Sequence, residues 1–540
     1  MRLRSWALAT VAMAITAILP SAALAQKPVE PTIEVRIRSV NDLLDKAEYI
    51  GGLVDQDEPI KQVRGLLKNL STDGKGVEGV DPKKPFGVYS VLTEDVQSSP
   101  VIVMVPIADQ ERFLAALKER LQIVPEKVDG GTLKANVPLI NEVFMRFSNE
   151  YLYIGRSAKD LDAKSLVSPK DFFAKDDGSV IAISARFDRI PAEVKTFVLG
   201  QLEHQIQEGI KKDDANKSPA EKKLGALLAD AVVGSTKMLA EDGKELSIKV
   251  FVDNKTDEIS FELGLTAKDG SPLSKTFAGL SGRSSSPAGI VAAKNTVASV
   301  SSKAGLPEEL RKRLAPVIDA AVKDAIDNAG DREAARRVLE PLAATAKAGN
   351  LDFAATLAGP DAKGKYAVLA AVVVKDAKEL EKVAKDFAAM IPAEAVDISF
   401  DVEKIGAFAL HKVEVKIADD NFENIFGTKM VWLAISDDTI VVSIEADGAL
   451  LKAGLKAKPT AAAPVFSAEI ALAKAVPLFQ KNLKPDELKA LIKDAFGAGS
   501  PEGKDTMAIS IEGGKQLTVK VKVKGKAFRL ATMMDQFKTK

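Results

Sequence analysis

Few residues of this 540-residue chain could support histidine- or cysteine-based catalysis or metal binding, because it contains two histidines and no cysteine. His204 lies on a predicted helix two positions past Leu202 of its apolar stripe, so we expect it at the surface. His411 falls in a predicted strand and shares a face with Val413 and Val415, which favours a half-buried, satisfied ring over a general base. Without cysteine, disulfides, thiol catalysis and thiolate metal sites are excluded. We therefore predict no catalytic residue, no metal site and no cofactor.

Adjacent acidic residues are the next candidates, because glycoside hydrolysis needs two carboxylates that face one bond. Sequence neighbours usually point apart, and these pairs stand in loop-like contexts, so turn and solubility roles are favoured. The turn from Asp253 to Glu258 has oxygen ligands for a weak Ca²⁺ site but lacks the EF-hand spacing, and we interpret it as a hairpin turn. The acidic pairs are Asp176-Asp177, Asp213-Asp214, Asp419-Asp420 and Asp437-Asp438.

One glycine-rich run has the spacing of a phosphate-binding loop, from Gly359 to Lys365. However, Tyr366 stands where a Ser or Thr would reach Mg²⁺, and a predicted strand follows in place of the helix that would hold the phosphates. We interpret the run as a polar hairpin turn. Serine nucleophiles are not indicated either, since no Gly-x-Ser-x-Gly elbow and no Ser-x-x-Lys pair occurs.

The most localised charge pattern is a basic ridge at the last predicted strand, where lysines alternate with valines and so share one face. Such a ridge could contact an anionic lipid, a polysaccharide or an acidic partner. Lysines also protect an exposed strand from edge-to-edge aggregation, and this second role is favoured. The ridge consists of Lys520, Lys522, Lys524, Lys526 and Arg529.

The N-terminus predicts export from the cytoplasm. Two arginines precede an apolar run from Trp6 to Leu19, and a small-residue site follows, so we expect a signal peptide over residues 1–25 with cleavage between Ala25 and Gln26. The run is shorter than the ~20 residues of a membrane-spanning helix, which favours cleavage over retention as an anchor. We therefore predict a periplasmic or extracellular protein with no transmembrane segment after cleavage.

Charge and composition limit the classes of partner that the protein is expected to bind. The chain has 75 basic and 75 acidic residues, and removal of the two arginines of the signal leaves a net charge of −2. A chain without excess positive charge is not expected to bind nucleic acid. Aromatic residues make up 5% of the chain, which disfavours a stacking surface for sugars. An unknown envelope protein or an anionic surface remains as the expected partner.

The order of predicted elements occurs twice along the chain. Copy one, residues 26–280, opens with a strand from Thr32 to Arg38 and a helix that Asn41 would cap, and it closes with an alternating hairpin and a helix. Copy two, residues 295–540, repeats this order after a Ser/Gly/Pro-rich stretch, 281–294, which we predict to be a linker. Adjacent strands interspersed with helices predict an α+β fold, with two tandem, similar domains that each hold a largely antiparallel sheet covered by amphipathic helices.

Two segments resemble a family of exported bacterial proteins found in planctomycetes. They are TIEVRIRSVNDLLDKAEYIGGL from Thr32 to Leu53 and VIVMVPIADQERFLAAL from Val101 to Leu117. The family has no assigned activity, so the resemblance implies export but no functional residues.

Three functions stay open at this point. We predict first a non-enzymatic binding or scaffold protein of the cell envelope, built from the duplicated unit. The alternative is a periplasmic carrier that holds an apolar or amphiphilic ligand between a sheet and its helices. A hydrolase without a recognisable motif is third.

Overall fold

The computed structural model describes residues 30–69, 77–137, 141–174, 177–213, 230, 233–293, 295–306, 308–388, 391–392, 394–417, 420–479, 484–497 and 501–538. The predicted signal peptide and its cleavage site at Ala25 and Gln26 lie outside these residues. The chain divides into two compact units. Unit 1 takes the described residues of Met1–Gln201 and Ala240–Lys268, and unit 2 takes those of Leu202–Leu239 and Asp269–Lys540.

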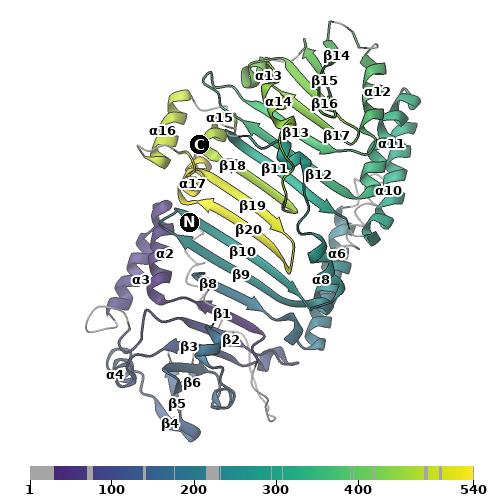
Figure 1. The fold of residues 1–540 in the computed structure, drawn as a ribbon. Coiled ribbons are helices and arrows are strands. Elements are labelled where there is room, and N and C mark those ends of the chain that lie inside the picture. The colour runs from purple at the N-terminus through teal and green to yellow at the C-terminus, as the bar shows by residue number, and fades with distance from the viewer. Residues whose placement is uncertain are drawn as a thin grey trace. The chain divides into compact units, whose positions relative to one another are not determined.

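Unit 1 contains an antiparallel sheet whose strand order, among the described residues, is β4-β5-β6-β7-β3-β2-β1-β8-β9-β10 (Figure 1). Strands with alternating apolar and polar residues pair in this way because one face can then be buried. The strands are β1 (Ile33–Ile37), β2 (Phe86–Ser90), β3 (Val101–Pro106), β4 (Glu126–Val128), β5 (Thr132–Val137), β6 (Asn141–Ser148), β7 (Tyr151–Gly155), β8 (Ile181–Ala185), β9 (Gly243–Asp253) and β10 (Glu258–Ala267).

In unit 2 the described strands are also antiparallel and follow the order β14-β15-β16-β17-β13-β12-β11-β18-β19-β20 (Figure 1). If the strands of each unit are counted from its own first strand, this order is the same as in unit 1. The strands are β11 (Thr296–Gly305), β12 (Asn350–Ala358), β13 (Ala367–Val373), β14 (Val396–Ile405), β15 (Phe408–Val415), β16 (Met430–Ile435), β17 (Thr439–Ile444), β18 (Phe466–Ala471), β19 (Thr506–Glu512) and β20 (Gln516–Lys524).

The α+β class predicted from the sequence is confirmed, since helices and antiparallel strands make up both units. The two alternating hairpins are also present as β9–β10 and β19–β20. The run from Gly359 to Lys365 is the turn between the antiparallel strands β12 and β13, with Asp361 Oδ1 accepting the backbone N–H groups of Lys363 and Lys365. The interpretation of this run as a hairpin turn is therefore confirmed.

Helices cover parts of both faces of the sheet of unit 1. Phe113 of α4 packs on one face, beside Met145 and Leu152, and the opposite face buries Tyr89 and Met104. The helices that begin in this unit are α2 (Val40–Leu53), α3 (Glu58–Asn69), α4 (Gln110–Leu121), α5 (Pro169–Phe172) and α6 (Ala192–Asp213), with short 3₁₀ turns η1 (Val96–Ser98), η2 (Asp129–Gly131), η3 (Lys159–Leu161) and η4 (Phe187–Arg189).

The cap of the first helix differs from the prediction. We expected Asn41 as the N-cap, but the N-cap lies two residues earlier, and the helix begins at Val40. Ser39 has an extended backbone, and its hydroxyl accepts the backbone N–H of Asp42, 3.0 Å away. Ser39 is therefore the N-cap, because a side-chain oxygen here satisfies a donor that lacks an intrahelical partner.

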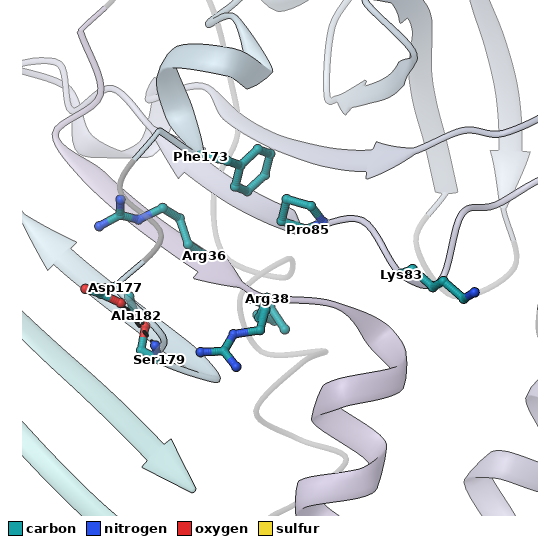
Figure 2. A pocket seen from close by; sticks show the side chains of 9 residues that line it. Arg36, Arg38, Lys83, Pro85, Phe173, Asp177, Ser179 and Ala182 are labelled. Carbon is teal, nitrogen blue, oxygen red and sulfur yellow. Dashed lines mark hydrogen bonds between the residues drawn. The ribbon is translucent and has the colours of Figure 1, made fainter. Parts of the chain in front are cut away.

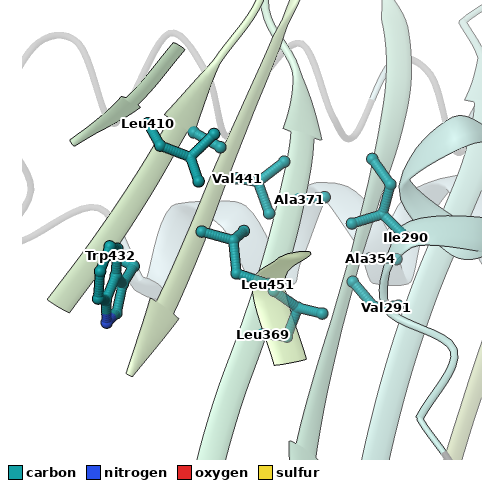
Figure 3. Packing of buried hydrophobic residues seen from close by; sticks show 10 residues of the cluster. Ile290, Val291, Ala354, Leu369, Ala371, Leu410, Trp432, Val441 and Leu451 are labelled. Atoms are coloured by element: carbon teal, nitrogen blue, oxygen red, sulfur yellow. The ribbon is translucent and has the colours of Figure 1, made fainter. Parts of the chain in front are cut away.

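Unit 2 buries a large apolar cluster between its sheet and two short helices, shown in Figure 3. Trp432 and Val441 of the sheet pack there with Ile290 and Leu451. Its helices are α8 (Pro272–Gly279), α9 (Ser286–Ile290), α10 (Glu308–Asp327), α11 (Arg332–Ala348), α12 (Ala377–Ala388), α13 (Asp420–Phe426), α14 (Ala449–Leu455), α15 (Leu472–Phe479), α16 (Pro485–Phe496) and α17 (Gly525–Lys538).

The stretch predicted as a linker, 281–294, instead belongs to unit 2. Ser285 is buried and caps α9, and Ile290 and Val291 lie in the apolar cluster of Figure 3. The Ser/Gly/Pro composition arises here from a capping serine, a proline in the first helical turn and Gly289, on which a Cβ would meet the Lys458 carbonyl oxygen at 2.2 Å. The same composition that is typical of linkers thus serves a tightly packed helix.

Within the described ranges, no helix combines the length and the apolar character that crossing a bilayer requires.

Candidate functional site

An exposed apolar row crosses three neighbouring strands of unit 1. Ile183 of β8 stands opposite Ile248 of β9, which stands opposite Leu263 of β10. Phe261 is two residues from Leu263 and so shares its face. Their exposed fractions are 39% for Ile183, Ile248 and Leu263 and 47% for Phe261. We call these four residues the apolar row.

The covering helix stops before the apolar row. At the turn end of the β9–β10 hairpin, Val252 and Ile259 are buried because Leu43 and Tyr49 of α2 pack on them. Further along the same strands, on the same face, exposure rises at Phe261 to nearly half of the side chain. Among the described residues, the row therefore continues a core face that α2 covers at Val252 and Ile259 and that is exposed at the row itself.

The other face of these strands carries polar residues and is the better buried one. Ser184 is 2% exposed, although its neighbour Ile183 is 39% exposed. Gly264, on the same face as Ser184, is also buried, although the preceding residue, Leu263, is exposed on the apolar face. Burial of a serine while isoleucine meets water reverses the usual arrangement, so the apolar row is a candidate contact surface.

The corresponding row of unit 2 differs in exposure. Its strands β18, β19 and β20 place Ala468, Ile509 and Val521 opposite one another. All three are half-buried, and none is exposed. The exposed apolar row is thus a property of unit 1 among these matching strands.

The predicted basic ridge is divided between two elements. Lys520, Lys522 and Lys524 alternate along β20, with Val519, Val521 and Val523 between them. Lys526 and Arg529 lie in α17, and Lys526 Nζ donates to the backbone carbonyl of Phe496 at 3.0 Å. Lys520 is 3.8 Å from Glu512. Contact of the ridge with an anionic partner stays a prediction.

The described members of the acidic pairs lie at separate places in the fold. Asp437 pairs with Lys378, and Asp438 accepts the hydroxyl of Thr439 in the turn between β16 and β17. Asp177 binds Lys249. Asp213 ends α6 and Asp420 begins α13, whereas Asp176, Asp214 and Asp419 lie outside the described residues. The turn after Asp253 is a hairpin turn, as interpreted, in which Asp253 accepts the backbone N–H of Lys255.

The two histidines lie in different environments. His204 is exposed on α6, as predicted. His411 of β15 is 1% exposed, and the expectation of half burial is therefore wrong for this residue. The register shifts between Ser399 and Glu403 of β14, opposite His411, and this bulge brings the backbone N–H of Asp401 to His411 Nδ1 at 3.1 Å. The bulge encloses the ring, which a strand pattern alone does not predict.

Glu381, Asp401 and His411 form a cluster in which one ligand atom from each lies within 4.8 Å of the others. Two observations oppose a metal site. His411 Nδ1 accepts a backbone N–H, so in neutral imidazole Nε2 carries the proton, 3.5 Å from Glu381 Oε1. Lys385 Nζ lies between the two carboxylates, 2.7 Å from Glu381 and 2.8 Å from Asp401. The lysine occupies the place that a cation would take.

Acidification is expected to destabilise the protein through His411. Burial lowers the pKa of the His411 ring, against the opposing effect of Glu381 and Asp401. The unfolded chain then binds a proton near the ordinary pKa of about 6.5, whereas the folded chain does not. The free energy of unfolding should therefore fall as the pH drops below about 6.5, by at most ~1.4 kcal/mol per pH unit, until the folded pKa is reached.

Urea unfolding between pH 5 and pH 8 measures this effect. His411→Gln should flatten the dependence in that window, and His204→Asn, at an exposed position, should leave it as in the original protein. An unchanged pH dependence in His411→Gln would show that other groups cause it.

Three comparisons with known proteins leave the chain without a match: no family model, no curated protein and no solved structure matches it.

Proposed function

We propose that this is an exported protein of the cell envelope that works by binding, without catalysis, and that the apolar row is its binding surface. The exposed apolar row is the observation that carries the proposal, since contiguous apolar side chains left in water mark interaction sites. The four residues form an open strip across three strands rather than a closed cavity. Such a strip fits the apolar side chains of a protein partner.

The two units have, in this proposal, a common origin in a tandem duplication. The matching strand order in β1–β10 and β11–β20 supports it. After duplication, one copy would keep the exposed row while its counterpart at Ala468 and Ile509 became better covered.

A carrier of an apolar or amphiphilic ligand is the alternative function. A carrier holds most of its ligand in a concave apolar site of about 300–1,000 Å³. Two hollows lined by described residues fall below this range: one in unit 1, about 280 Å³, is lined in part by Arg36 and Arg38, and one in unit 2, about 170 Å³, mixes alanines with Ser299, Ser301 and Thr356. Their size and their charged or polar walls favour the binding protein over the carrier of a large apolar ligand.

The test replaces two residues of the row together, Phe261→Ser and Leu263→Ser. Proteins crosslinked to the full chain in its own envelope fraction should be recovered from the original protein and reduced at least fivefold with the double variant. Because the two side chains are half-exposed, we expect the free energy of unfolding to fall by only about 1–2 kcal/mol. Urea unfolding checks that the variant remains folded.

Leu66→Ser is the matched control, since Leu66 is 67% exposed on α3, outside the row. It should leave recovery unchanged. Equal recovery with the double variant would rule out the row as the binding surface. If a fluorescent fatty acid binds saturably to the original protein and not to the double variant, the carrier is the better description.

A further inference from the structure

A hollow of about 280 Å³ opens in unit 1 on the side of the sheet away from the apolar row (Figure 2). Arg36 of β1 and Ala182 of β8 line it, and each alternates with a residue of the apolar face, Val35 and Ile183. At this volume the hollow is larger than a single inorganic ion needs, and it is separate from the surface discussed above.

Positive charge collects around the hollow. Arg36 and Arg38 stand two residues apart at the end of β1, and Lys83 lies in the loop before β2. The Nε atoms of both arginines are buried and have no hydrogen-bond partner. Arg38 has one long ion pair, with Asp42 at 3.8 Å, and no ion pair is described for Arg36 or Lys83.

The carboxylate in the lining does not neutralise these cations. Asp177 is bound by Lys249 Nζ at 2.8 Å and by the Ser179 hydroxyl at 2.7 Å. Burial alone would raise the pKa of Asp177, but these hydrogen bonds outweigh it and lower the pKa to about 2. Among the described residues that line the hollow, Arg36, Arg38 and Lys83 are cations and Asp177 is the one carboxylate, so positive charge is in excess there.

An aromatic and aliphatic wall completes the hollow, and it is held firmly in place. Figure 2 shows Phe173 and Pro85 together on one side, with Arg36 and Arg38 across from them. Phe173 stacks on Tyr151 with ring centroids 5.7 Å apart, and Phe172 meets its edge at 4.9 Å. The Tyr151 hydroxyl donates to the backbone carbonyl of Pro85 at 2.9 Å. The wall thus keeps its shape without a ligand.

We propose that this hollow binds a small organic oxyanion, with its phosphate or carboxylate group held by Arg36 and Arg38 and its apolar body against Phe173 and Pro85. Guanidinium groups suit oxyanions because they present several N–H donors in one plane. The buried Nε atoms gain partners when such a group binds, and the excess charge is balanced. The apolar wall selects an organic anion over inorganic phosphate.

Calorimetric titration of the full chain with phenyl phosphate, inorganic phosphate and phenol tests the proposal. Phenyl phosphate should bind saturably and at least tenfold more tightly than either of the other two, which lack the apolar body or the charge. Raising NaCl from about 50 to 500 mM should weaken it, because salt screens the attraction. Arg36→Gln should weaken binding at least tenfold, and Arg36→Gln with Arg38→Gln should abolish it.

Lys84→Gln is the control, because Lys84 is the neighbour of Lys83 but pairs with Glu150 at 2.7 Å and does not line the hollow. It removes the same charge and should change the affinity less than twofold. Thermal unfolding separates a binding role from a structural one: without ligand, Arg36→Gln should unfold at the same temperature as the original protein or higher, since Arg36 has no ion pair with any residue that the structure describes.

Three results would overturn the proposal: no saturable binding of phenyl phosphate, unchanged binding in the double arginine variant, or equal affinity for phenol. Equal affinity for inorganic phosphate would contradict the role of the apolar wall. None of these results bears on the apolar row, because Arg36 and Arg38 are no part of it.

Discussion

Replacement of Asp352 by alanine is expected to lower the free energy of unfolding by about 2–4 kcal/mol. Asp352 of β12 is 4% exposed and lies opposite Lys303 of β11, whose Nζ is 2.5 Å from Asp352 Oδ2. Its other oxygen accepts the hydroxyl of the buried Ser285 at 2.5 Å. Alanine would leave a poorly hydrated ammonium and a buried hydroxyl without this partner. Urea unfolding measures the loss.

Asp319→Ala is the matched control for this prediction. Asp319 is 2.7 Å from Lys347, a comparable distance, but both side chains are well exposed. An exposed pair of this kind contributes at most ~1 kcal/mol. If the two variants lose the same stability, burial is not what makes the Asp352 pair important. Asp352→Asn should lose less than Asp352→Ala, because an amide oxygen can still accept the Ser285 hydroxyl.

Much of the fold could be predicted because period-2 and helical patterns report which residues share a face. The hairpins β9–β10 and β19–β20 alternate without interruption, and both were predicted. The strand pair β4–β5 was not, since β4 has three residues and is largely polar. β14 was also missed, although Val396, Ile398, Phe400 and Val402 alternate with polar residues. A strand of three residues is too short for its alternation to stand out from a loop.

The candidate site was less predictable, because a pattern shows that a face is apolar but not what covers it. Ile248 and Val252 alternate on one face of β9, yet α2 buries Val252 and leaves Ile248 exposed. The basic hollow depends on Phe173 and Lys83 reaching β1 from distant parts of the chain. The sequence offered adjacent acidic residues as candidates, whereas the most buried carboxylates, such as Asp352, have no acidic neighbour in the sequence. Contacts over long sequence separations decide all three features.

Replacement of Glu445 by alanine is expected to have the largest effect, a loss of about 3–5 kcal/mol in the free energy of unfolding. Glu445 follows β17 and is 8% exposed. It accepts the backbone N–H of Leu450 at 2.7 Å and of Leu451 at 2.8 Å, and the hydroxyl of Ser443 at 2.6 Å. Bonds to a carboxylate are stronger than neutral ones, and this carboxylate also faces the positive end of α14.

A second acidic residue, Asp447, lies at the N-terminus of the same helix, α14. Comparing its replacement with that of Glu445 distinguishes the effect of hydrogen bonds from the general attraction of a negative charge to the helix N-terminus. Asp447 is exposed and accepts one backbone N–H, that of Ala449 at 3.1 Å. If the helix dipole dominated, Asp447→Ala and Glu445→Ala would cost similar amounts, each within about 1 kcal/mol. We expect instead that Asp447→Ala costs about 0.5–1 kcal/mol, because one exposed cap bond is lost. Glu445→Ala leaves a buried amide, that of Leu451, and a partly buried one, that of Leu450, without this partner beside the core. Urea unfolding of both single variants decides between the two accounts.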